Sequence, residues 1–156
     1  MFLAEGTGDP RRLFLQRLES VLGETGSIVV YNAAFEKGVL AQCAARLPEF
    51  GPWVDRVNRR VLDLLSPFKS FHYYHPQQHG SASIKAVLPA LTGRGYADLD
   101  IREGGTASLE YARVTFGDVL EAERQRVRHQ LEEYCCRDTE GMVWMVEALS
   151  RLVDKR

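Results

Sequence analysis

The stretch SIVVYNAAFEKGVLAQCAARL, residues 27–47, indicates a strand followed directly by a helix. Residues 27–31 form a short apolar run that contains β-branched side chains, which is typical of a strand, and residues 33–47 carry apolar side chains at helical spacing. Asn32 lies between them and is a residue type that favours a helix N-cap. The stretch therefore predicts an α/β arrangement in which an acid, Glu36, falls in the first helical turn.

Two acids occupy positions on the apolar faces of predicted helices. On helix 33–47, Glu36 lies at the centre of a stripe that contains Val39, Leu40, Cys43 and Leu47. On the long helix predicted at 119–153, Asp138 lies near the centre of a stripe of Leu131, Cys135, Met142, Met145, Val146, Leu149 and Val153. A buried carboxylate needs a hydrogen-bond donor, a cation or water. Taken one at a time, the position of Glu36 is explained by a favourable interaction with the helix dipole, and that of Asp138 by a salt bridge to an arginine. Taken together, the two acids suggest that they bind one shared cation.

The remaining sequence completes a pattern in which helices dominate the second half. One domain is predicted over residues 1–156, since the chain is 45% hydrophobic and can bury one core. Asp9 is available to cap the first helix. The predicted elements are helix 10–22, strand 27–31, helix 33–47, strand 61–65, an aromatic loop at 68–80, a short helix from Ser83 that ends at or before Pro89, helix 105–116 and helix 119–153.

Charge and hydropathy exclude some classes of protein. The net charge of -1 provides no overall attraction to nucleic acid, so such binding would need local patches. Two basic stretches, at 55–60 and 123–130, are either such patches or solvated helix faces. No apolar run is long enough to span a membrane, and the N-terminus lacks the pattern of a signal peptide. We expect a cytoplasmic protein that does not insert into membranes.

Cysteine and histidine residues allow further hypotheses. Three cysteines do not predict a disulfide framework, and Cys43 and Cys135 fall on apolar stripes as small core residues. Histidines 72, 75 and 79 in the aromatic loop permit a zinc hypothesis, although no CxxC pair accompanies them. The aromatic side chains of this loop either stack on unpaired bases or form a lid that packs on the core.

The segment VVYNAAFEKGVL resembles the second motif of DEDD-type 3′-to-5′ exonucleases, in which a strand ends in Asn and the next helix carries an acid beside an aromatic residue. The segment YCCRDTEGMVWMVEAL resembles the third motif in its tyrosine form, Tyr-x-x-x-Asp on a late helix. The whole chain most resembles the C-terminal part of a bacterial family, domain of unknown function 2779, which is itself similar to these exonucleases.

This resemblance implies a ribonuclease-H-like fold and a site in which four carboxylates hold two divalent ions, Mg²⁺ or Mn²⁺. Glu36 and Asp138 would be two of the four metal ligands, and Tyr134 would orient the attacking water. Asn32 would cap the helix that carries Glu36. Asp63 would line the cleft without being a usual ligand.

The resemblance also has a gap, because no Asp-x-Glu motif lies upstream of Asn32. We therefore expect an incomplete ribonuclease-H-like fold that lacks the first strands of its sheet. We expect this chain to be the C-terminal portion of the nuclease domain, inactive alone and with no metal bound in it, whereas the complete domain would bind Mg²⁺ or Mn²⁺. The alternative is a non-catalytic nucleic-acid-binding or protein-binding assembly module.

The missing strands also bear on partners. Strand 27–31 would have an open edge, which a second copy of the chain or the missing N-terminal segment would cover. Single-stranded DNA or RNA is the expected ligand, and a zinc module built on the histidine loop remains the third reading.

Overall fold

The computed structural model describes residues 2–154. It divides into two compact units, one of residues 9–87 and the other of the residues up to Gly8 together with those from Leu88 onward. The expectation that the chain is a single domain stays a prediction. The elements of the first unit are α1 (Arg11–Leu22), β1 (Ile28–Val30), α2 (Ala33–Arg46), a 3-10 turn (Pro48–Phe50), α3 (Gly51–Arg60), β2 (Val61–Asp63), α4 (Leu65–Lys69) and a second 3-10 turn (Pro76–Gln78).

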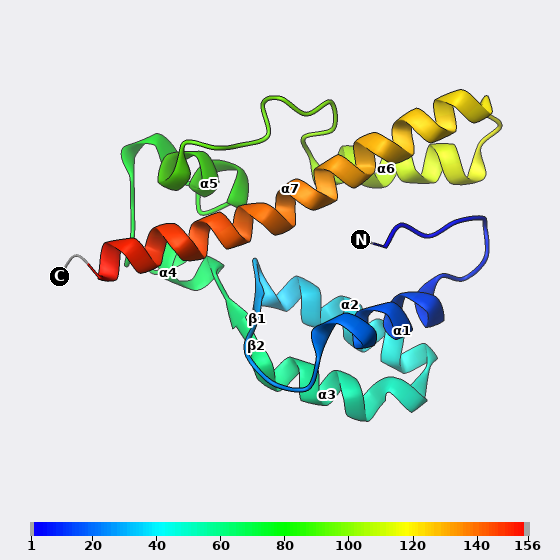
Figure 1. The fold of residues 1–156 in the computed structure, drawn as a ribbon, viewed down its shortest axis with the longest axis horizontal. Helices are drawn as coiled ribbons and strands as arrows, with labels where there is room; N and C mark the ends of the chain where they lie inside the picture. The colour runs from blue at the N-terminus through cyan, green and yellow to red at the C-terminus, as the bar shows by residue number, and fades with distance from the viewer. Residues whose placement is uncertain (1, 155–156) are drawn as a thin grey trace. The chain divides into compact units, whose positions relative to one another are not determined.

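Helix α5 (Ile84–Thr92) contains the boundary between the units, which falls after Val87. Beyond it the second unit contains α6 (Gly104–Phe116) and α7 (Glu121–Val153), as Figure 1 shows. Helix α5 continues through Pro89, so the predicted end of this helix before the proline is wrong. Among residues 2–154, no helix is both long and apolar enough to cross a bilayer.

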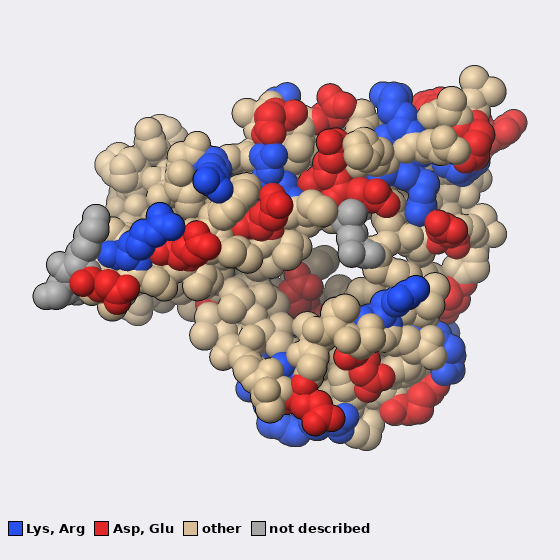
Figure 2. Space-filling model, in the orientation of Figure 1, with Lys and Arg blue, Asp and Glu red and all other residues tan. Residues whose placement is uncertain are grey.

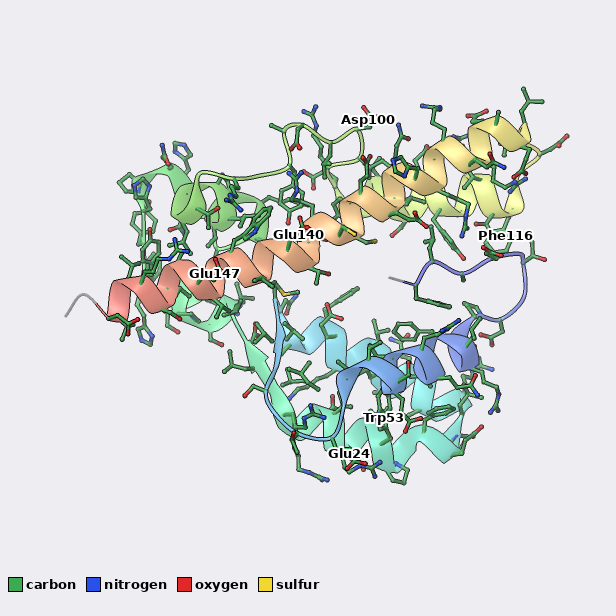
Figure 3. All side chains as sticks on the ribbon, in the orientation of Figure 1. Glu24, Trp53, Asp100, Phe116, Glu140 and Glu147 are labelled. Carbon is green, nitrogen blue, oxygen red and sulfur yellow. The ribbon has the colours of Figure 1, made fainter. Side chains whose placement is uncertain are left out.

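Helices α1, α2 and α3 build the core of the first unit. Trp53 on α3 points toward α1 and α2 (Figure 3) and packs with Leu15, which is fully buried. Amphipathic helices bury their apolar stripes against one another in this way. The other buried members of this core are Leu40, Cys43, Phe50, Val54 and Val57.

The sheet has two short parallel strands, β1 and β2, in the register Val30↔Asp63. Of the residues that the structure describes, 67% are helical, and the core of the first unit comes from helix packing. The predicted α/β, ribonuclease-H-like fold is therefore wrong, although the predicted helix-rich second half is present. The strand signals at 27–31 and 61–65 mark real strands of only three residues each. So small a sheet cannot form a layer for helices to cover, which leaves helix-on-helix packing as the architecture.

Asp63 caps two helices from the end of β2. Its carboxylate accepts hydrogen bonds from the backbone N–H groups of Asn32 (2.9 Å), Ala33 (3.0 Å) and Leu65 (2.9 Å). Asn32 adopts a left-handed conformation, φ 73°, and its side chain makes no capping bond. The residue that caps α2 is thus Asp63 rather than the predicted Asn32, because the parallel register brings the two strand ends together.

Arg60, in the first of the basic stretches, has a structural role. Its guanidinium donates hydrogen bonds to four backbone carbonyls of the loop between α1 and β1. The acceptors are Leu22 (2.9 Å), Gly23 (2.7 Å), Thr25 (2.5 Å) and Gly26 (2.8 Å). Arginine suits this position because its planar fork carries five N–H donors. This end of the 55–60 stretch stabilises the fold. Helix α3, which contains the stretch, was not among the predicted elements, although a solvated helix face was one reading of these basic residues.

Helices α6 and α7 pack side by side in the second unit (Figure 1). The buried residues of α7 are Val127, Leu131, Tyr134, Gly141 and Met145. Asp138 is half-buried and lies between Tyr134 and Gly141 in the same stripe, and with it the stripe follows alternating spacings of four and three residues. The predicted stripe had the right period but a rotated face, since Cys135 and Val153 are exposed.

The segment between α5 and α6 is fastened to α7 by Arg137. Its guanidinium donates two hydrogen bonds of 2.8 Å to the Asp98 carboxylate and a third to the carbonyl of Gly95. The hydrogen bonds from Arg137 lower the pKa of Asp98 to about 2, below its ordinary value. The bonds of Arg137 to Gly95 and Asp98 fix the part of the segment that contains Tyr96.

Candidate functional site

Asp138 is the acid around which the second unit builds a polar cluster. The Tyr96 hydroxyl donates a hydrogen bond of 2.6 Å to one carboxylate oxygen of Asp138. The rings of Tyr96 and Tyr134 lie beside each other, with centroids 6.1 Å apart. Both tyrosines are buried. The Asp138 carboxylate, on the buried stripe of α7, therefore has a hydrogen-bond donor in the Tyr96 hydroxyl of the preceding segment. This agrees with the expectation that a buried carboxylate needs such a partner.

The tyrosines of this cluster keep their protons at neutral pH. Burial and the hydrogen bond to Asp138 raise the pKa of Tyr96 above its ordinary value. Burial and the negative charge of Asp138 likewise raise the pKa of Tyr134. Proton loss would place a second negative charge beside the carboxylate, which explains the direction of both shifts. The hydroxyl groups are thus hydrogen-bond donors and not bases.

The predicted site residues divide between the two units. Tyr134 and Asp138 come together on one turn of α7, in the second unit. Glu36 lies in the first turn of α2, in the first unit, and is exposed, so the expectation that it faces inward is wrong. A helix N-terminus exposes its first turn, which is where an acid gains from the helix dipole. The pairing of Glu36 with Asp138 stays a prediction.

Asp138 is a suitable type of ligand for a divalent metal, but the described residues do not place enough such ligands together. Carboxylate oxygens are the ligands that Mg²⁺ and Mn²⁺ take in proteins. Within residues 2–154, no group of three or more His, Cys, Asp or Glu side chains is placed to hold a metal ion. This finding includes histidines 72, 75 and 79, so the described chain provides no zinc centre of that size. A metal at Asp138 would need ligands beyond that one residue.

The aromatic loop positions its histidines for local structure. His75 Nδ1 accepts a hydrogen bond of 3.3 Å from the N–H of Gln77, and the N–H of His75 donates one of 2.7 Å to the Gln78 side chain. These bonds form a capping box at the turn Pro76–Gln78. His79 adopts a left-handed conformation at the end of that turn.

Cys43 and Cys135 differ from each other. Cys43 is buried in the core of the first unit, as predicted, and burial raises the pKa of its thiol. Cys135 is exposed, so its predicted core position is wrong.

Sequence reasoning missed Tyr96, whose hydroxyl donates a hydrogen bond to Asp138. It lies in TGRGYADLD, which reads as an irregular link, and no helical or strand period marks its direction. Two features of the sequence could have indicated this contact. A buried acid needs a hydrogen-bond donor, and a tyrosine in a segment rich in turn residues can supply one.

The fold and the cluster define a helix-rich protein with a small parallel sheet and a tyrosine-bound acid on its longest helix. The family model described as "Domain of unknown function (DUF2779)" matches residues 1–83, more than half of the chain. The chain therefore belongs to this family, as the sequence resemblance predicted. No curated protein and no solved structure matches the chain. The resemblance to DEDD-type exonucleases gains no support from these comparisons and stays a hypothesis.

Proposed function

We propose that this chain supplies part of the catalytic site of a 3′-to-5′ exonuclease that depends on divalent metal and hydrolyses nucleic-acid phosphodiesters. The observation that carries the proposal is Asp138, a half-buried carboxylate on the core stripe of α7 with a tyrosine hydroxyl bonded to it. A half-buried carboxylate is costly unless it is bonded, so an acid in this position calls for a structural or functional role. The motif resemblance around Glu36 and Asp138 supports the choice of reaction.

Each residue has a distinct role in this proposal. Asp138 and Glu36 provide carboxylate oxygens to the metal, which needs further ligands besides these two. Tyr134, one helical turn before Asp138, holds its proton at neutral pH and donates a hydrogen bond to the attacking water. Tyr96 positions the Asp138 carboxylate through its 2.6 Å hydrogen bond.

A nuclease assay on this chain and on the full-length product of its gene tests the proposal. The substrates are end-labelled single-stranded DNA and RNA with Mn²⁺. We expect this chain alone to be inactive and the full-length product to shorten the substrate from its 3′ end. Asp138→Asn and Glu36→Gln in the full-length product should abolish the reaction. Glu140→Gln, which alters an exposed acid on the same helix (Figure 3), should leave the rate unchanged.

Two results would overturn the proposal. One is a full-length product without activity on either substrate, and the other is full activity after Asp138→Asn.

The second candidate function is a non-catalytic nucleic-acid-binding module. It is favoured by the absence, within residues 2–154, of a cluster of three metal-ligating side chains. Binding of single strands by both the chain and the full-length product, without hydrolysis by either, would select this function.

A further inference from the structure

The first unit contains a pocket beside the aromatic loop (residues 68–80). Its volume is about 140 Å³, close to that of the roughly 150 Å³ apolar cavity that accommodates a benzene ring. One six-membered ring therefore fits in it. Its lining includes Phe68, Lys69, Phe71, Tyr74, Gln78 and Ser81.

Two aromatic rings on this pocket are exposed. Phe71 is 69% exposed and Tyr74 is 47% exposed, and their ring centroids lie 5.9 Å apart. Phe71 adopts φ 55°, a left-handed conformation that is uncommon for a bulky residue. Unfavourable backbone conformations of this kind cluster at functional sites such as ligand-binding loops. The loop thus holds the Phe71 ring largely in solvent, where burial contributes little to stability.

The core does not need this pair of rings. Phe68 is almost fully buried and packs on Tyr31 and Tyr73, with centroid distances of 6.4 Å and 5.8 Å. These three rings anchor the loop. Phe71 and Tyr74 lie beyond them, so the predicted aromatic lid holds for Tyr73, which packs on Phe68, and does not hold for the exposed pair.

A buried amide supplies polarity in the pocket. Gln78 is 2% exposed; its oxygen accepts from the N–H of His75 at 2.7 Å, and its nitrogen donates to the carbonyl of Ser81 at 3.2 Å. A carboxamide has two donor hydrogens and two acceptor lone pairs, so one of each remains for a further partner. Because both existing bonds fix its orientation, this amide is preorganised to pair with the polar edge of a base.

The charge around the pocket favours an anionic ligand. Residues 64–97 contain no Asp or Glu, although the chain has 21 acids. Lys69 lines the pocket itself. Figure 2 shows no acidic side chain over the loop that precedes α5 on the visible face, among the residues that the structure describes. An apolar peptide would gain nothing from this local absence of acids, whereas a phosphate backbone would.

We propose that this pocket is a subsite for one unpaired nucleobase of a single-stranded nucleic acid. The base stacks on Phe71 and Tyr74, its edge pairs with the Gln78 amide, and the Lys69 ammonium contacts an adjacent phosphate. Stacking platforms next to cationic side chains are the usual means of binding single strands. The choice of nucleic acid as ligand rests on the proposed function, but binding at the subsite needs neither metal nor hydrolysis.

Fluorescence anisotropy with labelled oligothymidylate and oligouridylate in EDTA tests the subsite on this chain. We expect Phe71→Ala to weaken binding roughly ten-fold, the usual effect of removing one stacking partner. Phe116→Ala is the matched control, since Phe116 is 66% exposed on α6 (Figure 3) and should change nothing. Phe71→Trp should retain binding, and its fluorescence should be quenched by the stacked base. Far-ultraviolet circular dichroism verifies that each variant is folded.

Salt dependence tests the lysine separately. Lys69→Gln should weaken binding and reduce the slope of log K against log salt by about 0.7, the value for one phosphate contact with a single strand. Lys37→Gln, on α2, is the charge-matched control and should bind with the same salt slope as the unaltered chain.

The results separate this subsite from the proposed function. Absence of binding to both oligonucleotides, or equal affinity of the Phe71→Ala and Phe116→Ala variants, overturns the subsite. Binding in EDTA that depends on Phe71, together with a full-length product that has no nuclease activity, supports the subsite and overturns the proposed function.

Discussion

Tyr96 donates a hydrogen bond of 2.6 Å to Asp138, and this bond links the segment between α5 and α6 to the longest helix of the chain. The hydroxyl is buried, and the carboxylate is half-buried on the α7 stripe. Asp138 thus accepts a hydrogen bond from a phenol that lies 42 residues away in the sequence. The structural value of this bond can be measured without any knowledge of function.

Tyr96→Phe should lower the free energy of unfolding by about 1.5–3 kcal/mol, the range for hydrogen bonds to charged groups. Urea denaturation measures the change. Tyr111→Phe on α6 is the control, because no hydrogen bond of its hydroxyl occurs among residues 2–154. Equal stability of the two variants would show that Asp138 does not need the phenol.

Alkaline pH should destabilise the protein through its buried tyrosines. The pKa values of Tyr31, Tyr96 and Tyr134 are all raised above the ordinary value of 10, with burial as the largest cause. Below pH 10 both folded and unfolded chains hold these protons. Above it the unfolded chain releases them first, so the free energy of unfolding falls as pH rises. Urea denaturation at about pH 9 and about pH 11 measures this loss.

The same experiment on Tyr96→Phe isolates one contribution to the alkaline loss. The variant lacks one of the raised groups, so its stability should fall less between the two pH values. A loss of the same size in both proteins would contradict the assignment.

Asp63→Ala should destabilise the first unit by about 2 kcal/mol, the upper range for loss of a helix cap, because three backbone N–H groups lose their acceptor. Asp63→Asn should recover part of the loss, since one amide oxygen remains. Asp55→Ala, at an exposed position on α3, is the control for removal of a charge. Thermal unfolding followed by circular dichroism ranks the three variants, and an equal effect of Asp55→Ala would refute the capping role.

Arg60→Met should cost about 2 kcal/mol or more, because four carbonyl groups lose a charged donor. Arg60→Lys should restore little, since an ammonium cannot reach four acceptors in one plane. Arg59→Met is the neighbouring control at an exposed position. Hydrogen exchange of the amides at 23–27 should quicken in Arg60→Met alone; unchanged exchange would mean that the loop is held by other contacts.

The edge of β1 predicts self-association. Among residues 2–154, β1 pairs with β2 alone, and Ile28–Val30 contain no charge or proline to discourage a further strand. We expect light scattering to show a mass above 17.6 kDa that rises with concentration. A constant monomer mass, with slow exchange at Val29 and Val30, would indicate that the edge is protected within one chain.

Local elements were predictable because their signals are local. The strand and helix around Asn32 and the long helix at the C-terminal end follow from apolar period alone. Helix α3 was missed because its start, at Gly51 and Pro52, has the composition of a break, yet proline is accepted in a first helical turn. The end of helix α5 was predicted wrongly because proline disfavours the interior of a helix but does not forbid it, and α5 continues beyond Pro89.

The candidate site was predictable only in its acid. The position of Asp138 on a buried stripe follows from periodicity, but its partner Tyr96 is distant in sequence and lies in an irregular segment. The position of Glu36 was predicted wrongly from the same kind of pattern. Its spacing places it on the apolar stripe of the helix, but it lies in the first turn and is exposed. The ribonuclease-H-like sheet was implied by the motif resemblance, and two strand signals could not test it because the number of strands that pair is not a local property.

The four bonds of Arg60 also determine how the loop between α1 and β1 responds to solvent. Its acceptors are neutral carbonyls, so these bonds do not join two opposite charges. High salt should instead weaken the exposed ion pairs Arg11–Asp9 and Arg12–Glu49 in the same unit, because salt screens exposed charges. The start of α1 is therefore sensitive to ionic strength, while its end is held by hydrogen bonds to neutral groups.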